Sequence, residues 1–179
     1  EDGKFDIAFN SGGLTTLKFE RNGYASASRD IETRLQTMYG LEPVRLVKRD
    51  TKVTTLQTGS DVAQVATGSP VTDERGTRTA TVLIPPNTTA HLQMPSGASI
   101  PVENLNVRMT EFTVGPDGPK RMPAALPPQV AYTYALEIAA DEAIALGAEQ
   151  VVFSQPVPFY VDNFLSLPPG IAIPLGYLN

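Results

Sequence analysis

The stretch VVFSQPVPFYVDNFLSLPPG, residues 151–170, has the densest bulky apolar content of the chain. Its apolar side chains are Val151, Phe153, Val157, Phe159, Val161 and Phe164. Pro156 and Pro158 interrupt the run, and a Pro-Pro-Gly sequence ends it. Because proline has no N–H for a sheet ladder, this pattern predicts a buried strand that reaches a sheet edge and then turns. We interpret the stretch as an element that closes a core, not as a reaction centre.

The composition excludes several classes of function. The chain has 179 residues and no cysteine, which removes thiol catalysis, thiolate zinc sites and disulfides. A domain of this length buries roughly 70% of the surface of its unfolded chain, so it needs no such cross-links. The net charge is −5 and the basic residues are scattered, so we expect no nucleic-acid partner. No apolar run approaches the roughly 20 residues that span a bilayer, so we expect no membrane insertion.

Short alternating segments separated by turn residues make up most of the chain. Residues 4–9 and 14–19 alternate on either side of an Asn-Ser-Gly-Gly turn, which predicts a β-hairpin. Residues 77–84 and 105–114 are the strongest strand candidates farther along. With eleven or twelve strands and at most two short helices, the sequence predicts an all-β fold, an antiparallel β-sandwich. Residues 31–39 fit a short helix and an irregular connector equally well.

The second half of the chain adds four local expectations. Residues 115–128 contain five prolines, so they predict a proline-rich strap without helix or ladder. Residues 130–139 predict a strand, and Asp141 is expected to cap a short helix that ends at Gly147. Residues 171–178 predict a last strand. A change of composition near residues 40–43 divides the chain into an N-terminal hairpin unit, residues 1–40, and a main β-sandwich domain, residues 41–179.

Four phrases of the sequence, taken together and in order, are similar to the region ahead of the repeat shell in bacterial rearrangement-hot-spot (Rhs, or YD-repeat) proteins. They are DERGTRTATVLIPPNTTA, NVRMTEFTVGPDGPKRMPAALPP, YTYALEIAADEA and FSQPVPFYVDNFLSLPPGIAIPLGY. They fall within residues 71–177, more than half of the chain. The resemblance implies a secreted or surface-bound β-rich scaffold without catalytic residues, since the toxic activity of this family lies in a separate C-terminal domain. Its partners would be other copies or other domains of a larger secreted protein.

The earlier phrase DGKFDIAFNSGGLTTLKFERNGYASASR resembles the closing strands of a transthyretin-like, carboxypeptidase-regulatory-type module. A sandwich that starts partway through its strand order would leave an unpaired edge with exposed apolar side chains. We expect either that a neighbouring copy fills this edge by strand addition, giving a filament or other polymer, or that the chain is a fragment with a processed end at Glu1. The assembly edge would consist of Phe5, Ile7, Phe9, Leu14, Leu17 and Phe19.

Two alternatives to a structural role stay open. The strap could recognise a glycan or a protein, with Lys120, Arg121 and Met122 as its contact residues. A self-processing domain is the other alternative, because the segment TVLIPPNTTA loosely resembles ankyrin- and netrin-receptor-type modules, some of which cleave a Phe-Ser bond. In that case His91, the only histidine, would help Ser154 attack the peptide bond before it. An ordinary strand histidine is the simpler interpretation.

The acidic residues Glu137, Asp141 and Glu142 lie close together in the sequence. Carboxylates can hold a hard cation such as calcium, but the spacing matches no EF-hand loop and Asp141 already has an expected capping role. We therefore predict no cofactor and keep calcium at these three residues as the weaker alternative. The segment Asp73-Glu74-Arg75-Gly76 is expected to be a solvated turn. The sequence thus predicts a non-enzymatic, extracellular or cell-surface β-domain.

Overall fold

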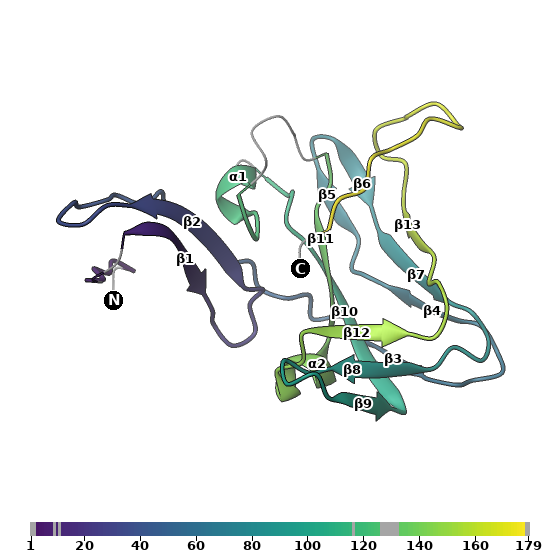
Figure 1. Cartoon of the computed structure of the whole chain (residues 1–179). Coiled ribbons are helices and arrows are strands. Elements are labelled where there is room, and N and C mark those ends of the chain that lie inside the picture. The colour runs from purple at the N-terminus through teal and green to yellow at the C-terminus, as the bar shows by residue number, and fades with distance from the viewer. Residues whose placement is uncertain (1–2, 9, 11, 116, 126–132, 178–179) are drawn as a thin grey trace.

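The structure is a computed structural model that describes residues 3–8, 10, 12–115, 117–125 and 133–177. In this part of the chain, short strands form five antiparallel sheets and the helices are confined to two short pieces (Figure 1). The predicted all-β class is confirmed. Neither helix has the length and apolar character needed to cross a membrane.

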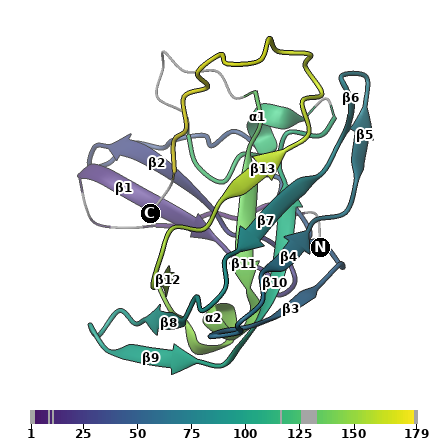
Figure 2. The ribbon, with the colours of Figure 1, turned by 90° about the vertical axis from the view of Figure 1, so that its right-hand side faces the viewer.

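Two three-stranded sheets form the sandwich-like body of the molecule. One has the order β11-β10-β3, with strands at Leu136–Ala140, Asn104–Glu111 and Thr54–Gln57. The other has the order β13-β7-β4, with strands at Phe159–Val161, Ala80–Ile84 and Gln64–Thr67. Figure 2 shows the second sheet in front, with β10 and β11 behind it. Both sheets contribute buried side chains to one core cluster.

Smaller elements close the ends of this body. A sheet of order β12-β8-β9 has strands at Gln150–Phe153, Ala90–Gln93 and Ser99–Val102, and it lies at the lower end in Figure 1. Helix α2, Asp141–Leu146, connects β11 to β12. Strands β5, Val71–Asp73, and β6, Gly76–Arg78, form a separate hairpin directly before β7.

The alternation of apolar residues explains why these strands bury one face. On β7, Ala80, Val82 and Ile84 are buried while the residues between them are partly exposed. On β10, Leu105, Val107 and Met109 follow the same period of two, as a strand with one face on the core requires. The remaining buried members of the core cluster are Leu56, Ala66, Ala90, Leu92, Ala140 and Ala143.

A two-stranded ribbon, which we call the arm, projects from the body at its N-terminal end (Figure 1). It consists of β1, Gly13–Phe19, paired with β2, Ala27–Thr33, in a register from Gly13↔Thr33 to Phe19↔Ala27, and we include in it residues 4–8, which precede β1 and contact it through the Phe5 and Phe19 rings. The expected pairing of residues 4–9 with 14–19 is therefore wrong. The turn between β1 and β2 gives β1 seven paired residues, whereas residues 4–8 form no strand. Phe9 lies outside the described residues.

The opening stretch of the sequence forms two strands instead of the single buried strand that we expected. Residues 150–153 belong to β12 and residues 159–161 to β13, and these strands lie in different sheets. Pro156 and Pro158 occupy the crossing between them, where no ladder N–H is needed. The last strand expected at residues 171–178 is also wrong for the described residues 171–177, which form no strand. Pro174 and Gly176 break this segment.

Three further local expectations need correction. The strap does contain a helical turn, α1, Gly118–Arg121, with proline in its first turn, where the missing N–H costs nothing. Asp141 is the first residue of helix α2 and not its cap: Ala140 occupies the N-cap position and no side chain caps the helix, whereas Gly147 ends it in the left-handed conformation at φ 68° as expected. Strand β11 begins at Leu136. Residues 31–39 contain no helix: residues 31–33 belong to β2, and residues 34–39 form an irregular connector after it.

Candidate functional site

The arm exposes most of the apolar side chains that the sequence assigned to an assembly edge. The exposed fractions are 51% for Phe5, 59% for Ile7 and 75% for Leu14, whereas Leu17 and Phe19 are half-buried. The Phe5 and Phe19 rings contact each other with centroids 5.7 Å apart. Strands β1 and β2 pair only with each other in the described part of the chain, so the arm also offers unpaired backbone.

The strap, residues 115–125 where they are described, joins the arm to the body. The backbone N–H of Ser28 in β2 donates to the carbonyl of Pro123 at 2.7 Å, and that of Arg45 donates to the carbonyl of Lys120 at 3.0 Å. Met122 is 6% exposed and packs in a second small core with Ala25, Val47 and Phe112. Of the three residues proposed to contact a ligand, Met122 is thus buried where the strap joins the arm to the body.

The two charged residues of the strap differ in their surroundings. Arg121 is half-buried, and its guanidinium donates to the carbonyl of Val114. Lys120 is exposed. Asp117 at the start of α1 forms an ion pair with Arg45 at 2.8 Å. The strap therefore offers a glycan or protein partner little free side-chain surface in its described residues, and its observed contacts are those of a structural joint.

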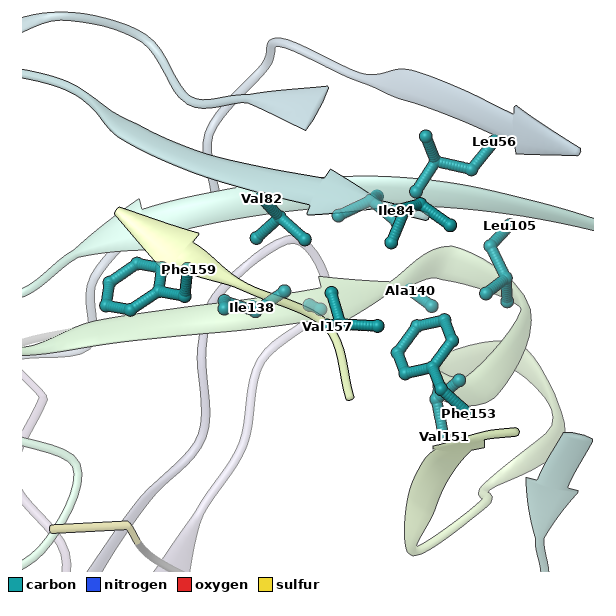
Figure 3. A pocket seen from close by; sticks show the side chains of 12 residues that line it. Leu56, Val82, Ile84, Leu105, Ile138, Ala140, Val151, Phe153, Val157 and Phe159 are labelled. Atoms are coloured by element: carbon teal, nitrogen blue, oxygen red, sulfur yellow. The ribbon is translucent and has the colours of Figure 1, made fainter. Parts of the chain in front are cut away.

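An apolar slot, with a volume of about 290 Å³, lies between the two sheets of the body (Figure 3). One wall is formed by β3, β10 and β11, and the other by β7 and by residues 151–159 of the opening stretch. Every described side chain that lines it is apolar. The lining residues are Leu56, Val82, Ile84, Leu105, Val107, Ile138, Ala139, Ala140, Val151, Phe153, Val157 and Phe159.

The slot is open beside β11. Ile138 lies on the core-facing side of this strand, next to Met109 of β10, yet it is 50% exposed. Strands β11 and β13 each stand at the end of the strand order of their sheet, so both have one unpaired edge among the described residues. An apolar side chain that points to the core but remains exposed indicates that the sandwich is uncovered there.

A buried ionic cluster lies at the C-terminal end of β10, at Glu111. Arg78 of β6 has no exposed side-chain surface. Its Nη1 and Nη2 donate to the two carboxylate oxygens of Asp73 at 2.6 and 2.9 Å, and its Nε donates to both oxygens of Glu111 at 2.9 and 3.1 Å. The Phe164 ring covers the guanidinium at 4.7 Å, and the Thr113 hydroxyl donates to Glu111 at 2.6 Å. The expected solvated turn at residues 73–76 is therefore wrong for Asp73.

The electrostatics of this cluster follow from its geometry. The paired guanidinium of Arg78 holds the pKa of Asp73 well below its usual range, and the hydrogen bonds that Arg78 donates to Asp73 raise the pKa of Arg78 in turn. Burial, together with the charge of Glu111, raises the pKa of the Tyr134 phenol. No buried side-chain nitrogen or oxygen among the described residues lacks a hydrogen-bond partner. The cluster thus holds the β5–β6 hairpin to β10 and presents no group to a ligand.

The contribution of Asp73 to stability should disappear in acid. Since its pKa is lowered in the folded state, the stabilisation is complete above the ordinary aspartate pKa, about 3.9, and is lost as the pH falls toward the folded-state value. We expect the gap in the free energy of unfolding between the native chain and Asp73→Asn to shrink steadily below about pH 4. Urea denaturation between pH 2.5 and pH 7 measures this gap, and a gap independent of pH would contradict the assignment.

The three carboxylates considered for calcium each have a different protein partner. Glu137 accepts two hydrogen bonds from Arg49 at 3.0 and 3.1 Å, and Asp141 accepts two from Arg108 at 2.7 and 2.9 Å. Glu142 accepts from the backbone and side-chain amides of Asn106. In the described residues no three acidic or histidine side chains gather as a cation site would require. The structure therefore separates the trio that the sequence grouped.

His91 and Ser154 lie on neighbouring strands, and no hydrogen bond joins them in the described part of the chain. His91 lies in β8 between Val152 of β12 and Pro101 of β9, and it is half-buried. The Ser154 hydroxyl accepts a hydrogen bond from the backbone N–H of Thr89 at 2.9 Å. This contact continues the pairing of β12 with β8. It gives Ser154 a structural role at the end of a strand, and it supplies no base for nucleophilic attack.

Sequence reasoning missed the slot and the ionic cluster. The slot is formed by strands that are distant in sequence, and Arg78 meets a carboxylate 33 residues away. The only sequence signal for the cluster was a charged residue inside the apolar segment TRTATVLI. The resemblance to the Rhs family stays a prediction, because comparison of the chain with family models, curated proteins and solved structures finds no match.

Proposed function

We propose that this chain is a non-enzymatic structural β-domain that assembles with other copies of itself through the arm. The observation that carries the proposal is the arm, a ribbon with exposed apolar side chains and unpaired edges that stands away from the body (Figure 1). The resemblance to Rhs proteins supports an extracellular or cell-surface setting. Another domain of a larger secreted protein is the alternative partner for the same surface.

The exposed area of the chain supports this proposal. The accessible surface is 12197 Å², whereas a folded monomer of 19.2 kDa is expected to expose about 8,400 Å². A stable protein–protein interface removes roughly 600–1,000 Å² from each partner. The excess of about 3,800 Å² is therefore larger than one such contact requires from each copy. Association through the arm would cover part of it.

The chemistry of the arm also favours association. Long edge strands with apolar side chains pair readily with other chains unless proline, lysine or a bulge blocks them. Strand β1 has the sequence GLTTLKF, in which Leu14 is exposed, no proline occurs and the single lysine, Lys18, stands next to the end of the strand. Backbone pairing at such an edge, together with burial of Phe5 and Leu14, would stabilise contact between copies.

Sedimentation velocity over a range of concentrations tests the proposal. We expect the sedimentation coefficient of the native chain to rise with concentration, and the variant Phe5→Ser/Leu14→Ser to stay monomeric at concentrations about tenfold higher. Removing two exposed apolar side chains of the arm weakens association by at least that factor. Ile173→Ser is the matched control, because Ile173 is 66% exposed and lies outside the arm. A native chain that stays monomeric at every concentration would refute the proposal.

A further inference from the structure

The geometry points to an acceptor for the arm: we infer that the apolar slot beside β11 receives residues 4–8 of a second copy as an added strand. This inference rests on the proposed self-assembly and names the two surfaces that meet. The donor segment, KFDIA, belongs to the arm and forms no strand in its own copy. The acceptor is the unpaired edge of β11 together with the slot that opens beside it.

The edge of β11 lacks the residues that usually protect an edge strand. Strand β11 has the sequence LEIAA, which contains neither proline nor lysine. By contrast, the edge strand β9 contains Pro101, and β13 directly follows Pro158. Proline on or beside an edge strand discourages the addition of another strand. A strand added to β11 would also cover Ile138, which is half exposed in the single chain.

The donor matches the slot in chemistry and in size. Phe5 and Ile7 are two residues apart, so in a strand they share one face and lie about 7 Å apart. An apolar cavity of about 150 Å³ holds one benzene-sized group, so the slot has room for roughly two. Its lining has no polar side chain that would be left without a hydrogen-bond partner among the described residues. Full burial of Phe5 would also outweigh its single ring contact with Phe19 in the arm.

The donor segment and the slot are different surfaces of the chain, and we take their contact to join two copies. In Figure 1 the arm extends to the left of the body, whereas β7, β12 and β13 lie on the right. Figure 2, seen from that right-hand side, has β7 and β13 in front of the arm. A donor and an acceptor that are different surfaces of one chain make a heterologous interface, which extends into an open chain or closes into a ring.

Two single substitutions separate the donor from the acceptor. Ile7→Asp leaves a copy that accepts but cannot donate, and Ile138→Asp leaves one that donates but cannot accept. Both side chains are at least half exposed, so the folded chain tolerates the charge. Each variant alone should assemble at least about tenfold more weakly than the native chain, since a carboxylate would have to enter an apolar slot. An equal mixture of the two should form heterodimers that do not extend, as sedimentation velocity would show.

Matched controls and a cross-link complete the test. Ile144→Asp and Ile173→Asp replace isoleucines that are 44% and 66% exposed and do not line the slot, so both variants should assemble as the native chain does. Because the chain has no cysteine, Phe5→Cys mixed with Ile138→Cys should give a disulfide-linked dimer under mild oxidation. Met38→Cys mixed with Ile138→Cys should give less than about a tenth of that yield, because Met38 lies outside the donor segment.

The outcomes distinguish this inference from the proposed function. If the native chain assembles but Ile138→Asp assembles equally well, the slot is not the acceptor, although self-assembly stands. If Ile138→Asp and Ile173→Asp prevent assembly and Ile7→Asp does not, the occupant is the C-terminal segment and our donor is wrong. If the native chain does not assemble at all, the proposed function and the inference both fail. Heterodimers in the mixture of Ile7→Asp and Ile138→Asp, together with the disulfide cross-link between positions 5 and 138, support both the proposed function and the inference.

Discussion

Replacing Arg78 by alanine should lower the free energy of unfolding by about 3–5 kcal/mol, the range for removing one partner of a buried ion pair. The side chains of Arg78 and Glu111 are 0% and 3% exposed. Without the guanidinium, the Glu111 carboxylate would stay buried next to the Asp73 carboxylate with no cation between them. Equilibrium unfolding in urea at pH 7 measures the loss, which should appear as a lower midpoint with an unchanged slope.

Arg108→Ala provides the matched control for this prediction. Arg108 also forms a two-pronged ion pair, with Asp141, but the two side chains are 26% and 37% exposed. Solvent screens such a pair, so its loss should cost no more than about 1 kcal/mol. The hydrogen bonds from Arg108 do lower the pKa of Asp141. Equal losses for Arg78→Ala and Arg108→Ala would show that burial does not decide the strength of these pairs.

A combined variant tests the reason for the loss. If the cost of Arg78→Ala comes from the stranded carboxylates, then Arg78→Met/Asp73→Ala/Glu111→Leu should be more stable than Arg78→Ala alone. Replacing a whole buried ionic group by apolar side chains is often neutral or stabilising, because the penalty of burying the charges disappears with them. A triple variant that is less stable than the single one would contradict this account and assign the cost to lost packing around Phe164.

Leu92→Ala should cost about 2–5 kcal/mol of the free energy of unfolding, the range for a fully buried leucine. Leu92 is 0% exposed and lies in the middle of β8, between Val151 of β12 and Ile100 of β9. The substitution leaves a cavity in the core, where the surrounding strands close in only partly. Thermal and urea unfolding both measure the loss.

Leu14→Ala is the control for Leu92→Ala and also separates stability from assembly. Leu14 is 75% exposed, so the free energy of unfolding should change by less than about 0.5 kcal/mol. Both substitutions should be compared at a concentration where the Phe5→Ser/Leu14→Ser variant is monomeric, because assembly would itself add to the apparent stability. A loss from Leu14→Ala comparable to that from Leu92→Ala would show that the arm is part of the folded core.

Much of the secondary structure could be predicted from the sequence. Residues 80–84 and 104–111 form β7 and β10 because their apolar residues alternate with a period of two, and this pattern depends only on neighbouring residues. Gly147 ends α2 because glycine adopts the left-handed conformation without strain. The strand expected at residues 171–178 failed for a local reason too, since Pro174 and Gly176 break an alternation that otherwise looks regular.

The candidate sites were harder to predict. Phe5, Ile7 and Leu14 are exposed apolar residues, as the sequence predicted. The hairpin predicted between residues 4–9 and 14–19 is wrong, because β1 pairs with β2 and residues 4–8 form no strand. It grouped Glu137, Asp141 and Glu142 by their spacing, yet they bond to Arg49, Arg108 and Asn106 respectively. Their partners lie 33 to 88 residues away in the chain. Sequence spacing cannot reveal such pairs, because the partners come from β10 and from the segment before β3.

By itself, the sequence determined the all-β class, the positions of most strands and the apolar character of residues 151–170, because these depend on local alternation and on where proline and glycine stop a strand. Only the tertiary structure decided that residues 151–170 divide between two sheets, that Arg78 is buried between two carboxylates, and that Ile138 borders an open slot. These features depend on which distant strands meet. That choice is made by the burial and pairing of the whole chain.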